Sequence, residues 1–194
     1  MARFDSPVHP TGWHQSLVPP PAHECSFLKP RLPISRRRQW FLSRLDDPSA
    51  FPFAVTDQRT GALLGTTSLY DYLPQQQRVE TGGTFYGRQF WGSHVNPASK
   101  HMLLAYAFDV LSVHRVGFRC DARNVRSAAA IERLGAQFEG VLLGHRGAPD
   151  GGRSDTAVFS ILRHEWPVLR ERLQQRLAPF ALPQDYAGRA VAAL

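Results

Sequence analysis

A helical segment from Asn96 to Leu111 constrains the fold most, because it is apolar on nearly every side. Leu104, Ala107, Phe108 and Leu111 keep the spacing of one helix face. Most of the other positions in the segment are apolar as well. A helix of this kind needs cover on more than one side. We therefore expect it to be buried against a sheet.

The start of this helix is predicted at Asn96 and Pro97, since an asparagine side chain can cap free N–H groups and a proline at the first helical position lacks the donor anyway. The residues from Arg88 to Val95 join a strand pattern to this start. Unpaired N–H groups and the helix dipole favour a phosphate there, and Gly92 lets backbone approach closely. From these residues alone, an ordinary strand-to-helix turn remains an alternative.

Strand patterns flank this helix on both sides along the chain. They cover residues 51–57, 63–72 and 78–86 before it, and 116–120, 138–145 and 156–162 after it. A second helix is expected over Asn124 to Leu134, closed by a left-handed Gly135, and an amphipathic last helix runs from Trp166 to Leu177. This order predicts an α/β fold: one mixed, mostly antiparallel sheet with a central strand-helix-strand crossover and flanking helices.

One domain is expected from the length of 194 residues and the mass of 21.8 kDa. Residues 1–33 hold seven prolines and no sustained period, so they form an irregular arm. The domain proper spans residues 34–180, beginning with a short helix over Arg36 to Leu45, and residues 181–194 form a C-terminal tail.

Composition excludes several classes of protein. No apolar signal region or membrane-length apolar run occurs, so we expect a soluble cytoplasmic protein without membrane contact. Cys25 and Cys120 stand far apart, without disulfide or zinc spacing, so no metal is expected. The formal charge of +7 and pI near 10.1 favour an anionic partner. The basic run Arg36 to Arg38 is expected to recruit an acidic acceptor surface.

Three stretches carry a family resemblance: Trp91 to Lys100, Asp121 to Leu142, and Arg153 to Trp166. In this order and with these separations, the chain from about Phe51 to Leu177 resembles the GNAT N-acetyltransferases, in their RimJ/RimL-like branch of ribosomal-protein N-terminal acetyltransferases. The resemblance implies acetyl-CoA as cosubstrate and an amine acceptor, most simply a protein or peptide N-terminus, with a ribosomal protein as a candidate.

The resemblance also implies which residues form the cofactor site. The pyrophosphate loop and its flanks fall on Arg88, Gln89, Gly92, Ser93, His94, Val95 and Asn96. His94 replaces the third small residue of the family's loop pattern, but its backbone N–H can still serve the anion cradle if the side chain turns outward. On the second helix, Asn124 is implied to contact the pantetheine arm, and the Ser127 hydroxyl to reach the cofactor sulfur. Both residues also fit a local helix cap.

Two residues are implied to be catalytic. Glu80 would draw a proton from the amine, although an exposed carboxylate paired with Arg78 or a neighbour is an equal interpretation, and Glu139 is the competing base. Ser127 would assist the leaving thiolate, because Ile131 occupies the place where relatives carry a tyrosine. The oxyanion should meet a strand amide near Gly82 to Thr84, where paired glycines can accommodate a bulge.

Two other classes of function remain as alternatives. One is an RNA- or ribosome-binding module that uses Arg36 to Arg38 and stacks bases on Phe85, Tyr86, Phe90 and Trp91. The other is an acyl-CoA-binding protein without turnover. Neither cysteine has an activating neighbour, so an enzyme would use direct attack in a ternary complex. The sequence leaves a homodimer open.

Overall fold

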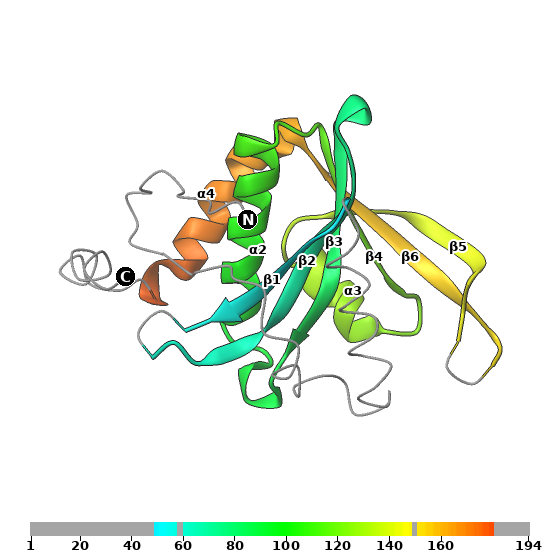
Figure 1. Ribbon diagram of the computed structural model, residues 1–194, viewed down its shortest axis with the longest axis horizontal. Helices are drawn as coiled ribbons and strands as arrows, with labels where there is room; N and C mark the ends of the chain where they lie inside the picture. The colour runs from blue at the N-terminus through cyan, green and yellow to red at the C-terminus, as the bar shows by residue number, and fades with distance from the viewer. Residues whose placement is uncertain (1–48, 58–59, 149–150, 181–194) are drawn as a thin grey trace.

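The computed structural model describes residues 49–57, 60–148 and 151–180 (Figure 1). Several expectations lie outside these ranges: the irregular arm, the helix over residues 36–45 with its basic run, Cys25 and the C-terminal tail. They stay predictions.

Six strands form one sheet with the order β1-β2-β3-β4-β6-β5 (Figure 1). Their bounds are β1 Phe51–Thr56, β2 Leu63–Leu73, β3 Arg78–Tyr86, β4 Arg115–Asp121, β5 Gln137–Gly147 and β6 Arg153–Leu162. Only β3 and β4 are parallel neighbours, and the other four pairings are antiparallel. The mixed, mostly antiparallel sheet is therefore confirmed.

Three α-helices accompany the sheet: α2 Val95–Ala105, α3 Val125–Glu132 and α4 Trp166–Leu177. α2 connects the parallel strands β3 and β4, which is the predicted crossover, and α4 lies beside α2 (Figure 1). Short helical turns complete the chain. They are η1 Pro74–Gln76, η2 Arg88–Phe90, the π-helical η3 Tyr106–Val110, η4 Arg163–Glu165 and η5 Ala178–Phe180.

The main core combines one face of β4 with all three α-helices. Val116, Phe118 and Cys120 alternate along β4 and are buried in one cluster with residues of α2, α3 and α4. Trp166 at the start of α4 is also in this cluster, stacks on Phe108 and donates its indole N–H to Asp109 at 3.1 Å. The predicted anchoring of the last helix is confirmed. The opposite face of β4 carries Arg115 and Arg119, as the alternation indicated.

The predicted start of the buried helix is wrong by two residues. The helix begins at Val95 with His94 as the N-cap, so Asn96 and Pro97 lie inside it. Val95 is buried in a second, smaller core cluster with Val55 and Leu64, and its N–H donates to the Ser93 hydroxyl at 3.2 Å. Packing of Val95 therefore sets the first turn, and the proline is tolerated just after it.

The predicted end of the same helix is also different. The α-helix stops at Ala105 and continues as the π-helix Tyr106–Val110, in which the N–H of Leu111 donates to the Tyr106 carbonyl at 3.0 Å. Beyond it, Val113 is fully buried, and its N–H donates to the Ala107 carbonyl at 3.1 Å. The wider turn lets the chain leave the helix with Val113 in the core.

In the described part of the chain, no helix has the length and apolar character needed to cross a membrane. The same residues contain no group of three or more His, Cys, Asp or Glu side chains that could hold a metal ion.

Candidate active site

The parallel strands β3 and β4 are paired along only part of their length. Their register runs from Arg78 opposite Arg115 to Thr81 opposite Phe118, and no pairing of β3 with β4 continues beyond Thr81. The rest of β3, from Gly82 to Tyr86, therefore has an edge towards β4 that the described residues do not pair. The sheet is open at the carboxyl ends of two parallel strands, where α/β proteins bind their ligands.

A β-bulge lies at the start of this opening. The pairing of β2 with β3 changes register between Thr66 and Ser68, so that Gly83 and Thr84 together face the single residue Thr67. Gly83 has a φ of +57°, which a side chain would disfavour. The bulge expected at the paired glycines is confirmed. Its role towards an oxyanion stays a prediction.

The loop before α2 lies next to the opening because it follows β3 directly. Gly92 has a φ of +76°, and a Cβ built on it would have no heavy atom within 4 Å, so its backbone faces open space. Ser93 donates to the Phe90 carbonyl at 2.7 Å, which fixes the loop. The His94 ring stacks on Phe180 at 4.3 Å between centroids, and this contact directs it towards η5. A concave backbone thus precedes a helix N-terminus whose N-cap residue supplies no side-chain cap.

Two arginines flank the exposed Trp91 in the same loop. The guanidinium carbon of Arg126, in the first turn of α3, lies 3.8 Å from the centroid of the Trp91 ring, and that of Arg88 lies 5.9 Å from it. The indole therefore ties the loop of α2 to the start of α3 by cation–π contact. Arg88 and Gln89 are both exposed.

The start of α3 has the local cap that the sequence indicated. Asn124 is the N-cap, and its side-chain oxygen accepts the N–H of Ser127 at 3.1 Å. The Ser127 hydroxyl bonds the Cys120 thiol on β4. Burial raises the pKa of the Cys120 thiol, and the bond from Ser127 lowers it by less. Ser127 is therefore held over the carboxyl end of β4, next to the opening.

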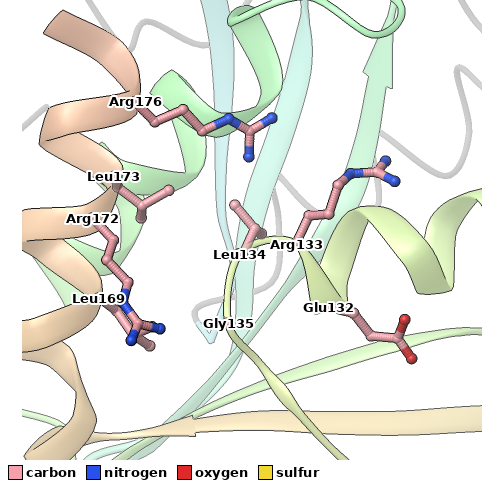
Figure 2. A pocket seen from close by; sticks show the side chains of 8 residues that line it. All are labelled: Glu132, Arg133, Leu134, Gly135, Leu169, Arg172, Leu173 and Arg176. Carbon is pink, nitrogen blue, oxygen red and sulfur yellow. The ribbon is translucent and has the colours of Figure 1, made fainter.

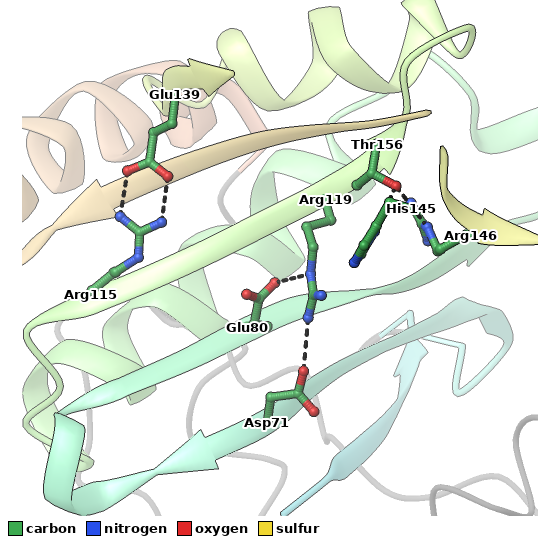
Figure 3. Close-up of polar contacts among 8 residues, drawn as sticks. All are labelled: Asp71, Glu80, Arg115, Arg119, Glu139, His145, Arg146 and Thr156. Carbon is green, nitrogen blue, oxygen red and sulfur yellow. Dashed lines mark hydrogen bonds and ion pairs between the residues drawn. The ribbon is translucent and has the colours of Figure 1, made fainter. Parts of the chain in front are cut away.

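Glu80 lies at the closed side of the opening, on the face opposite Val79 and Thr81. It accepts a hydrogen bond from Arg119 Nε at 2.8 Å, and Arg119 also donates to Asp71 at 2.8 Å (Figure 3). The Glu80 side chain is only 13% exposed. Of the two interpretations of Glu80, the structure shows the neighbour pairing, with Arg119 as the partner, while Arg78 bonds Gln76 instead.

The competing carboxylate, Glu139, lies on β5, with β6 and β4 between it and β3. It accepts both guanidinium nitrogens of Arg115 and the Ser160 hydroxyl (Figure 3). The bond from Arg115 lowers the pKa of the Glu139 carboxyl. Because Arg115 pairs with β3 at the closed end, Glu139 lies farther from the opening than Glu80 does.

Lys100 was not predicted as a site residue, yet it reaches the bulge from α2. It is 5% exposed, and its Nζ donates to the hydroxyls of Thr67, Thr81 and Thr84 at 2.8–2.9 Å. Burial lowers the pKa of the Lys100 amine to about 7. The available signal was a single lysine within an otherwise apolar helix, but its partners on β2 and β3 could not be read from spacing.

A pocket outside this region lies between the end of α3 and α4 (Figure 2). Leu134, Gly135, Leu169 and Leu173 form its apolar part, and Arg133, Arg172 and Arg176 are exposed around it with Glu132. None of the site residues predicted from the sequence lines this pocket. Gly135 has the predicted left-handed φ of +95°, and a Cβ there would lie 2.3 Å from Leu169, so close packing of α4 also requires glycine.

A family model described as an acetyltransferase (GNAT) domain matches residues 17–137, more than half of the chain. The chain belongs to the GNAT acetyltransferase family. The open β3–β4 pair and the loop before α2 are therefore features of a GNAT domain.

Individual relatives agree with this membership. A Bacillus subtilis (strain 168) protein, "Putative ribosomal N-acetyltransferase YdaF", is 31% identical over 106 residues. That alignment covers 55% of this chain and 57% of the relative, less than two thirds of its length. A crystal structure of an acetyltransferase from T. thermophilus is 32% identical, with a TM-score of 0.76 over 91% of this chain and 100% of that one. A GCN5-related N-acetyltransferase from Brucella melitensis is 28% identical, with a TM-score of 0.71 over 84% and 74% of the two chains.

Proposed function

We propose that this GNAT protein transfers the acetyl group of acetyl-CoA to an amine, by direct attack in a ternary complex. The observation that carries the proposal is the opening of β3 and β4 beyond Thr81 and Phe118, with the starts of α2 and α3 at the same end of the sheet. It offers a cleft for an extended thioester next to a helix N-terminus that can receive a phosphate.

The residues around the opening fit the two chemically distinct parts of acetyl-CoA. The concave backbone of Gly92 and the start of α2 suit the pyrophosphate, with Arg88 and Gln89 exposed beside them. Ser93, His94, Val95 and Asn96 contribute the rest of this loop and first turn. Asn124 and Ser127, at the start of α3, would face the pantetheine arm and its sulfur.

The reaction needs a neutral amine, a stabilised carbonyl oxygen and a protonated leaving thiolate. Acetyl-CoA supplies the activated acyl carbon. Glu80 would take the proton that the amine nitrogen loses as the C–N bond forms, and an amide of the Gly82–Thr84 bulge would receive the carbonyl oxygen. Ser127 would donate to the sulfur as the C–S bond breaks.

For the acceptor, we propose the α-amino group of a protein or peptide. Such a group has a pKa of about 7.7 to 8.0, against about 10.4 for a lysine side chain, so much more of it is neutral near pH 7. A carboxylate engaged by Arg119 suits this modest demand. The name of the Bacillus relative suggests a ribosomal protein as the acceptor, in the cytoplasm.

The alternative of an RNA-binding module loses part of its aromatic surface. Tyr86 and Phe90 pack against the core cluster of Val55, Leu64 and Val95, and the Tyr86 hydroxyl bonds Ser99. They do not form an open stacking platform. An acyl-CoA-binding protein without turnover remains an outcome of the test below.

The test combines binding with turnover. Calorimetry should show acetyl-CoA binding to the unmodified protein, and a peptide mixture should trigger release of the free thiol. Gly92→Glu should abolish binding through its charge and its strained φ, whereas Gly147→Glu, on β5, should not. Unchanged affinity in the Gly92 variant would remove the basis of the cofactor site, and binding without thiol release would leave an acyl-CoA-binding protein.

A further inference from the structure

Lys100 is buried among neutral partners. Its three contacts, to Thr67, Thr81 and Thr84, are all hydroxyls, and no carboxylate within the described residues contacts it. Removing an amine of this kind from water is costly, and neutral hydroxyls offset the cost less well than a carboxylate would. An apolar residue at the same place on α2 would bury more cheaply, so the lysine calls for an explanation other than stability.

The three hydroxyls surround the bulge. Thr81 precedes the two glycines of β3, Thr84 follows them, and Thr67 lies opposite on β2. Thr67 and Thr84 also bond each other at 2.9 Å, so the contacts form one connected network. Gly82 and Gly83 are the most flexible residues a strand can contain. The Lys100 amine therefore fixes both ends of a segment that would otherwise vary in conformation.

This restraint does not depend on whether the amine is charged. An ammonium group donates to all three hydroxyls, and a neutral amine donates two protons and accepts one, which a hydroxyl can supply. The same three partners can be kept in both states. The restraint therefore operates on both sides of neutral pH.

The restrained segment is also the first part of β3 without a β4 partner. Pairing with β4 ends at Thr81, the residue that Lys100 bonds, and the bulge begins directly afterwards. A thioester entering the opening would meet the amides of Gly82, Gly83 and Thr84 first. A donor that must meet a developing oxyanion needs to be in place before the reaction.

We propose that Lys100 is a positioning residue that holds the Gly82–Thr84 bulge in the geometry that receives the thioester carbonyl. This inference rests on the proposed acetyl transfer and adds a residue to it. Lys100 does not touch the reacting atoms. It acts through Thr67, Thr81 and Thr84.

The test compares two variants that remove the network with one that keeps it. Lys100→Met removes the amine at similar volume, and Thr84→Val removes one hydroxyl without changing the shape of the side chain. Thr84→Ser retains that hydroxyl. The measurements are kcat and KM for acetyl-CoA, the melting temperature, and the infrared carbonyl stretch of bound acetyl-CoA labelled with 13C at the carbonyl carbon.

We expect the carbonyl stretch of the bound thioester to shift to lower frequency in the unmodified protein and in Thr84→Ser. In Lys100→Met and Thr84→Val the shift should shrink, and kcat should fall by about 10²-fold, the usual effect of small misplacement at a reacting centre. KM for acetyl-CoA should stay within about twofold, because the phosphate contacts are unchanged. A merely structural lysine would lower the melting temperature without changing the carbonyl stretch of the folded fraction.

The outcomes separate the two proposals. If the unmodified protein neither binds nor consumes acetyl-CoA, the proposed function fails, and this inference fails with it. If it does both, but folded Lys100→Met and Thr84→Val match its carbonyl stretch and kcat, only the role of Lys100 is overturned. Should Lys100→Met not fold, the comparison of Thr84→Val with Thr84→Ser decides.

Discussion

The two faces of β3 hold polar groups in opposite ways. On one face Glu80 meets Arg119, which also bonds Asp71, so every charge has a partner of opposite sign. On the other face Lys100 meets only hydroxyls. The paired face is partly exposed, whereas Lys100 is 5% exposed. The comparison teaches that charge pairing follows the wetter face, while the dry face uses neutral groups to shape backbone.

The largest effect should come from the paired face. Glu80→Gln removes the proposed proton acceptor, and loss of a positioned proton-transfer group costs about 10²- to 10⁴-fold in rate. Much of that rate should return as pH rises, because alkaline medium supplies the neutral amine. A pH-rate series at saturating acetyl-CoA measures this, with Glu139→Gln as the control expected to keep the wild-type profile. Wild-type rates for Glu80→Gln at every pH would move the base to Glu139.

The dry face should reveal itself through the pH dependence of stability. Burial lowers the pKa of Lys100 from 10.5 to about 7. Between these values the unfolded chain binds a proton that the native protein does not, so the free energy of unfolding rises with pH, by at most about 1.4 kcal/mol per pH unit. Below about pH 7 both states are protonated, and the cost of burying the charge is fully present.

Denaturant unfolding of the wild type and Lys100→Met at pH 6, 8 and 9.5 isolates this contribution, since other titrating groups are common to both proteins. The stability of the wild type relative to the variant should increase across the series. A constant difference would show that the Lys100 amine does not change its protonation between pH 6 and 9.5.

A smaller effect is expected when the pairing itself is broken. Arg119→Met leaves Glu80 largely buried without its partner, and we expect the free energy of unfolding to fall by about 1–3 kcal/mol, less than for a fully buried pair because the side chains are partly exposed. Chemical denaturation measures it. Asp71→Asn, at the more exposed end of the same network, is the matched control and should cost less. Equal losses in both variants would contradict the ranking by burial.

The smallest effect should come from Ser127. Ser127→Ala removes one neutral hydrogen bond to the leaving sulfur, which we expect to lower kcat by less than about tenfold. No recovery should occur at alkaline pH, because the missing group concerns the thiolate and not the amine. Steady-state kinetics from pH 6 to 9 tests this, and an alkaline rescue like that of Glu80→Gln would assign both residues to the same proton.

The sequence predicted those parts of the fold that depend on local pattern. The strand Arg78–Tyr86 and the helix Trp166–Leu177 have the predicted bounds, because alternation and amphipathic spacing are local signals. The start of α2 was misplaced because burial of Val95 against Val55 and Leu64, a non-local contact, outweighed the proline signal.

The site divides along the same line. Asn124 could be recognised as a cap because its partner, Ser127, is three residues away. Arg119 bonds Glu80 and Asp71 across 39 and 48 positions, and Lys100 reaches Thr67 across 33. Separations of this size follow from strand order and register, which spacing in one sequence does not encode. The roles assigned to Glu80, Ser127 and the loop before α2 stay predictions.

The stacking of His94 on Phe180 has a consequence for how the protein is made. A ribosome delivers the loop before α2 near the middle of the chain, but the aromatic ring against which that loop packs is almost the last described residue. The phosphate-binding loop therefore reaches its final packing only after α4 has been synthesised and has docked beside α2. A nascent chain arrested before residue 180 would carry this loop without that contact, so full cosubstrate affinity would coincide with the end of translation.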